Sequence, residues 1–122
     1  MSPQSKFPML GFELQGHPNN TDRMFSHIVV FWTIPLNRAA ADELLAGANR
    51  LLKDIPGLLQ FHAGKMVPSR RSVVEQGYQV ALNLAFADKP AMQSYQKHPQ
   101  HLEFVEKCVK PLVKKVVVYD FE

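Results

Sequence analysis

The sequence predicts an α+β domain, in which helices cover one face of an antiparallel sheet of four strands. Along residues 24–122 the patterns follow the order strand, helix, strand, strand, helix, strand. Residues 78–86 form the clearest strand, because large apolar side chains alternate there with small or polar ones. The first strand is apolar on both faces, so we expect both faces of the sheet to be covered.

The first half of the domain holds two strands and one helix. The run MFSHIVVFWTI, which begins at Met24, is rich in β-branched and aromatic residues and predicts the first strand. His27 and Phe31 lie on one of its faces, and Trp32 and Ile34 lie on the other. Pro35 ends this strand, Asn37 is placed to cap the following helix, and a second strand is expected over residues 58–67.

The second half holds the third strand, a divided helix and the last strand. Asp88 is a suitable cap for the helix that follows the third strand. Pro99 disfavours helical geometry at His98, so the helix should break there and a new one should start. Leu102, Val105 and Val109 are expected along one side of the new helix, and residues 112–121 form the last strand.

Composition limits the class of protein. With 122 residues, 46% of them hydrophobic, the chain suits one domain, residues 24–122, preceded by an arm, residues 1–23. The net charge is +3, but the basic residues are dispersed, so no nucleic-acid partner is expected. No apolar run suits a membrane span, so no membrane association is expected. The lone cysteine, Cys108, fits a reducing, cytoplasmic location.

The element order is that of the ferredoxin-like β-α-β-β-α-β fold. If helices cover one face of the sheet, the other face would expose a large apolar patch. A second copy of the sheet, packed face to face in a symmetric homodimer, is the simplest cover. We therefore expect two chains to pair as a dimeric α/β barrel.

Five short motifs resemble the stress-responsive dimeric α/β-barrel (Dabb) family. They are SHIVVFW, IPG, GYQVALNLAFAD, YQKHPQHLEF and VVVYDF, in that order. The family includes a plant polyketide cyclase, olivetolic acid cyclase, which works without metal or cofactor. By position, the resemblance implies that His101 is a general base, that Tyr95 orients or polarises the substrate and that His27 lines the pocket. Phe31 and Val80 are further candidates for substrate binding.

The chain also departs from the cyclase pattern. Val80 and Ala48 stand where the cyclase has a pocket histidine and a pocket tyrosine, so the same substrate is not expected. Two interpretations of His101 stay open: it is a catalytic base, or it forms a structural hydrogen bond. His98 and His101 lie three residues apart, but Pro99 separates them and no further ligand follows at a usual spacing. No metal or cofactor is therefore expected.

Two functions follow from these observations. The first is cofactor-free acid/base chemistry, of the cyclase or lyase kind, on a small apolar oxygenated metabolite, with the histidine as base. The alternative is a non-catalytic stress or assembly protein in which the homodimer itself is the functional unit. The sequence leaves open whether the protein is an enzyme.

Overall fold

Four strands form one antiparallel sheet in the computed structural model, which describes residues 24–122; the predicted arm lies outside these residues. The strands are β1 (Phe25–Thr33), β2 (Gln60–Lys65), β3 (Val80–Phe86) and β4 (Val113–Phe121). Their order across the sheet is β2-β3-β1-β4, and every neighbouring pair is antiparallel. This confirms the predicted ferredoxin-like fold.

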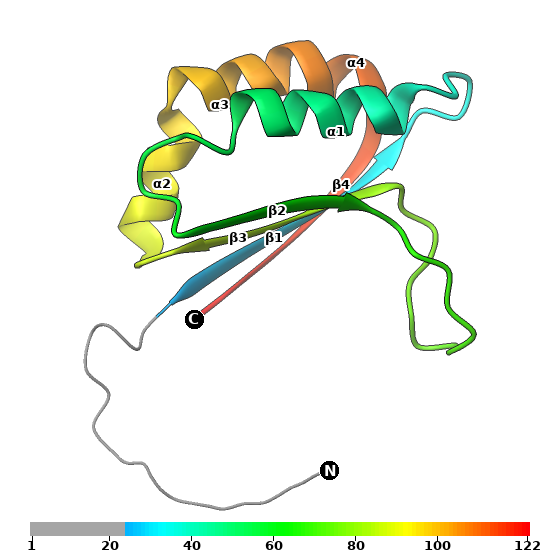
Figure 1. Cartoon of the computed structure of the whole chain (residues 1–122), viewed down its shortest axis with the longest axis horizontal. Coiled ribbons are helices and arrows are strands. Elements are labelled where there is room, and N and C mark those ends of the chain that lie inside the picture. The colour runs from blue at the N-terminus through cyan, green and yellow to red at the C-terminus, as the bar shows by residue number, and fades with distance from the viewer. Residues whose placement is uncertain (1–23) are drawn as a thin grey trace, which may run out of the picture.

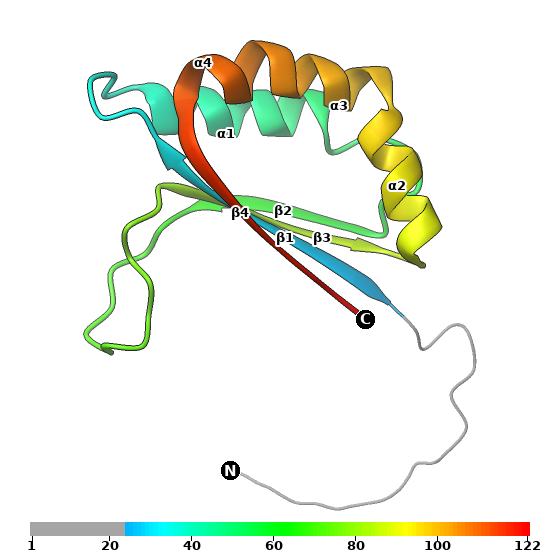
Figure 2. The same ribbon diagram turned by 180° about the vertical axis from the view of Figure 1, so that it is seen from behind.

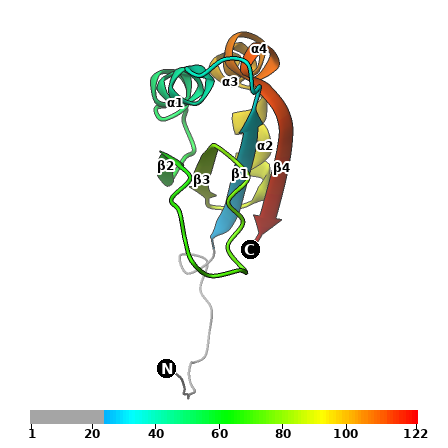
Figure 3. The same cartoon turned by 90° about the vertical axis from the view of Figure 1, so that its right-hand side faces the viewer.

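All helices lie on one face of this sheet (Figures 1 and 2). They are α1 (Ala40–Leu51) and α2 (Lys89–Lys97), followed by a segment made of α3 (Pro99–Phe104), the π-helical turn η2 (Val105–Val109) and α4 (Lys110–Leu112). Seen from the side, α1 stands over the β2 side of the sheet, while α3 and α4 stand over β1 and β4 (Figure 3). Within residues 24–122, no helix lies on the opposite face of the sheet, and we call it the open face.

The hydrophobic core lies between the sheet and the helices. Residues along β1 are alternately buried and half-buried, and the buried set includes His27, Val29 and Phe31. From the helices, Leu44 and Phe104 are among the side chains that meet this face. Burying such a side chain contributes about 1.5–3 kcal/mol, so the pattern of β1 determines which face receives the helices.

Two predicted boundaries differ from the structure. Strand β2 begins at Gln60, later than the predicted residue 58. The chain first makes a turn after Pro56, in which Gly57 adopts φ 97°. Helix α1 begins three residues beyond Asn37. The Asn37 side chain accepts a hydrogen bond from the Ala39 N–H at 2.9 Å, so it caps a turn that precedes the helix.

Ile34 is not on the outer face of the first strand as predicted. The pairing of β1 with β4 shifts register between Trp32 and Thr33, and β1 ends at Thr33. This irregularity interrupts the alternation of faces, and Ile34 packs against the core instead.

The prediction that Leu102 lies on the packed side of the second helical segment was wrong. Leu102 is 57% exposed, whereas Phe104 and Cys108 are buried and face α1. Leu102 and Phe104 are two residues apart on α3, so their side chains point about 160° away from each other, and the side of Phe104 is the packed one. Val105 and Val109 are half-buried and lie beside the core.

The predicted break at Pro99 is confirmed. His98 has ψ 139°, ends α2, and caps α3 by accepting a hydrogen bond from the Gln100 N–H at its ring Nδ1, at 3.1 Å. Pro99 occupies the first position of α3, where a missing N–H costs nothing. The two helices therefore meet at an angle, which sets the direction of the residues on either side.

Candidate functional site

A cavity of about 280 Å³ lies between β1 and β4 on one side and the segment from α2 to η2 on the other. Strand β4 is an edge of the sheet, and its cavity-facing residues Val116 and Val118 are 42% and 45% exposed. The mouth of the cavity therefore runs along β4, whereas its floor is the buried face of β1.

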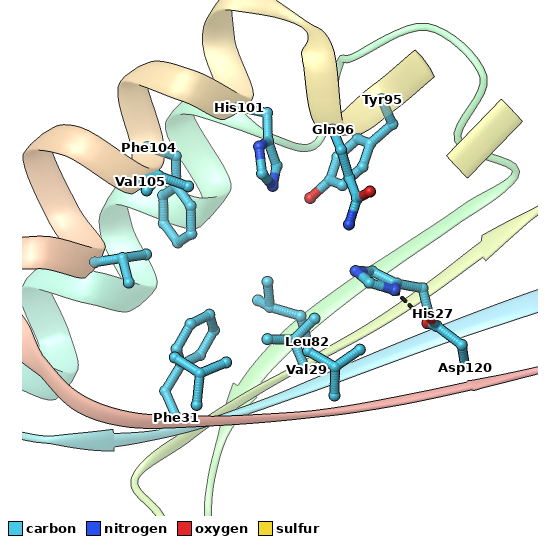
Figure 4. A pocket seen from close by; sticks show the side chains of 13 residues that line it. His27, Val29, Phe31, Leu82, Tyr95, Gln96, His101, Phe104, Val105 and Asp120 are labelled. Atoms are coloured by element: carbon cyan, nitrogen blue, oxygen red, sulfur yellow. Dashed lines mark hydrogen bonds and ion pairs between the residues drawn. The ribbon is translucent and has the colours of Figure 1, made fainter. Parts of the chain in front are cut away.

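Four polar side chains gather at one end of the cavity (Figure 4). His27 comes from β1, Tyr95 and Gln96 from α2, and His101 from α3. The ring centroids of Tyr95 and His101 are 4.8 Å apart, and those of His27 and Tyr95 are 6.3 Å apart. The structure thus brings together the three residues that the resemblance singled out.

The helix break explains how Tyr95 and His101 reach the same space. On a continuous helix, residues six positions apart point about 120° away from each other, because each residue turns the chain by about 100°. The extended backbone at His98 redirects the chain between them. Their side chains then converge on the cavity (Figure 4).

His101 is held in its neutral form by its surroundings. Burial lowers the pKa of its imidazole from the ordinary value of 6.5, and the nearby His27 lowers it further, while the backbone of Gln96 opposes the shift. Its Nδ1 is buried and has no hydrogen-bond partner among the described residues. Leaving such an atom unpaired costs about 1–3 kcal/mol. A neutral imidazole is able to accept a proton near neutral pH.

Tyr95 is held in its protonated form. It is 2% exposed and packs against Phe86 and His101. Burial raises the pKa of the Tyr95 hydroxyl well above its ordinary value. The hydroxyl therefore remains a hydrogen-bond donor across the physiological pH range.

His27 is oriented by a partner on the neighbouring strand. Its Nδ1 lies 2.5 Å from Oδ1 of Asp120, and the register of β1 with β4 places the two residues opposite each other. Because a carboxylate only accepts hydrogen bonds, Nδ1 donates, and Nε2 is the ring nitrogen left for the cavity. The pair holds the His27 ring against the polar end of the cavity (Figure 4).

The remainder of the cavity is apolar. Leu82 and two residues of β1 line its floor, and residues of α3, η2 and β4 line its walls; these are Val29, Phe31, Phe104, Val105, Val109, Val116 and Val118. Of the other predicted binding residues, Phe31 therefore lies in the lining. Val80 is fully buried in the core and is not among the lining residues. Ala48 is likewise buried in the core.

Two polar lining residues, Asp120 and Gln96, were not among the site candidates of the sequence analysis. Asp120 stood out only as an acidic residue in the apolar run VVVYDF, and its pairing with His27 depends on strand register, which the sequence pattern does not supply. Gln96 lies inside the motif YQKHPQH, but its place beside Tyr95 became evident only with the direction of α2 (Figure 4).

Within residues 24–122, no three His, Cys, Asp or Glu side chains are grouped closely enough to hold a metal ion. His98 and His101 do not pair, because His98 is engaged as the cap of α3. In the same part of the chain, no helix has the length and apolar character that crossing a membrane requires.

Comparison with known sequences supports one family. The family model described as "Stress responsive A/B Barrel Domain" (Dabb) matches residues 25–122. A stress-response A/B barrel domain-containing protein of Arabidopsis thaliana is 29% identical over 80 residues, which are 66% of this chain and 70% of the relative. The chain therefore aligns with this family over almost the whole part that the structure describes.

Solved structures agree with this result. A Dabb protein with a ferredoxin-like fold from Mesorhizobium loti is 26% identical, covers 81% of this chain and 95% of its own, and has a TM-score of 0.66. The hydroxynitrile lyase of Passiflora edulis is 20% identical over 80% of this chain and 91% of its own, with a TM-score of 0.66, which shows the fold alone. Other matched structures of the same fold are described as dimeric. As its motifs predicted, the chain belongs to the Dabb stress-responsive A/B barrel family.

Proposed function

We propose that the protein binds a small, apolar, oxygenated metabolite in the cavity and transforms it by cofactor-free acid/base chemistry. One observation carries this proposal: a neutral imidazole, His101, lies beside a protonated hydroxyl, Tyr95, at the polar end of an otherwise apolar cavity. The volume of about 280 Å³ is near the lower limit for small-molecule pockets, about 300 Å³, so the ligand is of modest size.

In the proposed reaction, His101 removes a proton from a carbon beside a carbonyl group of the ligand. As the enolate forms, the Tyr95 hydroxyl donates a hydrogen bond to the oxygen that gains negative charge. A positioned general base contributes about 10²–10⁴-fold to the rate of such a step. The apolar part of the ligand lies against Phe31, Val105 and Val109, away from the polar end.

His27 and Asp120 assist in this proposal. The hydrogen bond between them restrains the His27 ring and directs its Nε2 at the ligand oxygen or at a second polar group of the ligand. His101 and His27 differ in this respect, because His101 lacks such a partner on Nδ1. His101, whose neutral form is favoured, is the ring assigned to exchange protons.

The relatives support the fold of the proposed enzyme and fix neither the reaction nor the substrate. The motifs of this chain resemble those of a polyketide cyclase, and its fold is shared with a hydroxynitrile lyase. Val80 and Ala48, which replace two polar groups of the cyclase, are buried in the core here. A ligand with fewer polar groups than the cyclase substrate fits this difference.

Hydrogen exchange on a simple ligand tests the proposal. The measurement follows, by proton NMR in D₂O, the loss of the C–H signal between the two carbonyl groups of an alkyl β-keto ester. His101→Gln is expected to lower the protein-dependent exchange rate by about 100-fold or more, because the base is lost. His98→Asn is the matched control, since asparagine preserves the cap of α3 and His98 lies outside the cavity lining. Equal rates in the parent and His101→Gln proteins contradict the assignment of the base.

A second candidate function is that of a non-catalytic stress or assembly protein whose homodimer is the functional unit. It is favoured by the open face, where Tyr119 and Phe121 are 58% and 60% exposed and Ile28, Val30 and Trp32 are only half-buried. An apolar surface of this extent on one face of a sheet indicates a partner. We propose that the partner is a second copy of the chain, as in the dimeric structures of the same fold.

A charge on the open face tests the homodimer. Val30→Asp is expected to convert a dimer to a monomer, because a carboxylate between Ala81 and Val117 would be buried without a partner. Leu102→Asp, on the helical side and 57% exposed, is the matched control and should remain dimeric. Light scattering of the parent and both variants gives the masses. A parent protein that is monomeric at all concentrations rules out the homodimer. The hydrogen-exchange assay then tests the proposed cavity chemistry separately.

A further inference from the structure

A second pocket lies at the end of the sheet opposite to His27. It has a volume of about 310 Å³ and is lined by the end of β1, the loop that leads into α1, the segment before β3 and the start of β4. The loop after β1 and the start of β4 meet at this end of the sheet (Figure 1). Thr33 of this pocket is six residues from His27 on β1, about 20 Å at about 3.3 Å per residue. The second pocket is therefore separate from the cavity that His27 and His101 line.

The neutral side chains of the second pocket use their acceptor oxygens within the protein. Oε1 of Gln79 accepts hydrogen bonds from the Thr33 N–H at 2.8 Å and from the Thr33 hydroxyl at 3.2 Å. Oδ1 of Asn37 accepts a hydrogen bond from the Ala39 N–H at 2.9 Å, which leaves the amide nitrogen of Asn37, a group that only donates. The polar groups left to meet a ligand are therefore mainly donors.

Both charged side chains of the second pocket are cations. Arg38 and Lys114 are exposed, and no Asp or Glu of residues 24–122 is among the lining residues. In the same part of the chain, neither of these side chains forms an ion pair. Two cations beside one pocket repel each other, and an anion between them replaces this repulsion with two attractions. The pocket therefore favours an anionic ligand.

Two carboxylates lie close to the second pocket along the chain, and both are engaged elsewhere. Asp42, which follows a lining residue of α1, pairs with Lys65 at 2.7 Å. Oε2 of Glu75 accepts a hydrogen bond from the Gly77 N–H at 2.8 Å. The positive charge of the pocket consequently stays available to a ligand.

We propose that the second pocket binds the phosphate group of a small phosphorylated metabolite. The Arg38 guanidinium has a planar fork of N–H groups that matches phosphate oxygens, and the Lys114 ammonium supplies a second positive charge. A phosphate ester carries a charge of about −1.5 to −2 at pH 7, which balances these two cations. The pocket is larger than a phosphate group alone, so it also has room for a small group attached through the ester oxygen. This site depends neither on the chemistry proposed for His101 nor on the homodimer.

Binding of phenyl phosphate to the full chain tests the proposal. Isothermal titration calorimetry gives the dissociation constant, and proton–nitrogen NMR spectra show which amide signals shift. Phenyl phosphate should bind and shift the amide signals of Asn37, Ala41 and Lys114, whereas phenol should leave them unchanged. Arg38→Gln and Lys114→Gln should each weaken binding by about tenfold or more, because each removes a charged hydrogen-bond donor.

Lys115→Gln is the matched control for the loss of charge. Lys115 is next to Lys114 on β4, but its ammonium lies over the Trp32 ring, 4.5 Å from the ring centroid. At about 0.15 M salt this variant should bind phenyl phosphate within about threefold of the parent, because charges outside the pocket are screened. Equal losses of affinity in Lys114→Gln and Lys115→Gln would indicate unspecific attraction and overturn the site. Unchanged affinity in Arg38→Gln, or pocket amide signals that phenyl phosphate does not shift, would overturn it as well.

Discussion

The protonation states of the cavity residues follow from where each side chain lies. His101 is half-buried beside a second imidazole, so its neutral form is favoured. Tyr95 is buried among aromatic rings, so its hydroxyl stays protonated. His27 differs because Asp120 accepts a hydrogen bond from it. A base, a donor and an oriented imidazole thus arise from burial and one strand pairing.

The lowered pKa of His101 predicts how stability changes with pH. In the unfolded chain this histidine titrates near 6.5, and in the folded chain it titrates lower. Between the two values the unfolded state binds more protons, so the contribution of His101 to stability is complete above pH 6.5 and is lost as pH falls through the folded value. The parent protein should therefore lose more stability than His101→Gln between pH 7 and pH 5.

Denaturant unfolding of both proteins at several pH values measures this difference. Comparison with His101→Gln removes the contribution of the other histidines, which are the same in both chains. A stability difference between the two proteins that stays constant from pH 7 to pH 5 would contradict the buried, neutral state of His101.

At the scale of elements, local patterns predicted the main features and missed those that depend on packing. Pro99 restricts the backbone conformation of the residue before it, so the sequence alone predicted the break at His98. The exposure of Leu102 was not predicted, because which side of α3 packs against the rest of the protein depends on contacts between elements, which the local pattern does not supply. Likewise, Asp120 became a site residue only through the register of β4 with β1.

The contact between α1 and η2 offers a test of this packing. A Cβ on Gly47 would lie 2.5 Å from the Cys108 Sγ, which is buried. Gly47→Ala should therefore destabilise the protein by about 1–3 kcal/mol through overpacking, although alanine favours a helix by about 1 kcal/mol. In a Cys108→Ala background the clash is removed, and the same change should become neutral or stabilising.

Thermodynamic cycles built from urea unfolding of the four proteins give the coupling between these positions. If Gly47→Ala has the same effect in both backgrounds, the close approach of α1 and η2 does not limit the residue at position 47. Such a result would also remove the packing explanation for the buried position of Cys108.

At the scale of the whole molecule, the sheet serves two purposes on its two faces. The face of His27, Val29 and Phe31 receives the helices and lines the cavity, which settles a question that the apolar pattern of β1 left open. The open face keeps an apolar surface that the described residues of one chain do not cover. The four-stranded order was predictable because element order alone restricts the topology. A pocket was expected only through the family resemblance, and its walls were not predictable, because β4 and η2 are brought together only in three dimensions.

The central claim is that His101 is a neutral base that faces a ligand in the cavity. Nitrogen-15 NMR of histidine-labelled protein, titrated with acid in the presence and absence of the β-keto ester, tests it most directly, with His101→Gln used to assign the resonance. The claim predicts a neutral His101 ring at pH 7, a titration midpoint below 6.5 and a shift of this resonance when the ester binds. A midpoint at or above 6.5, together with a resonance that the ester leaves unchanged, would contradict it.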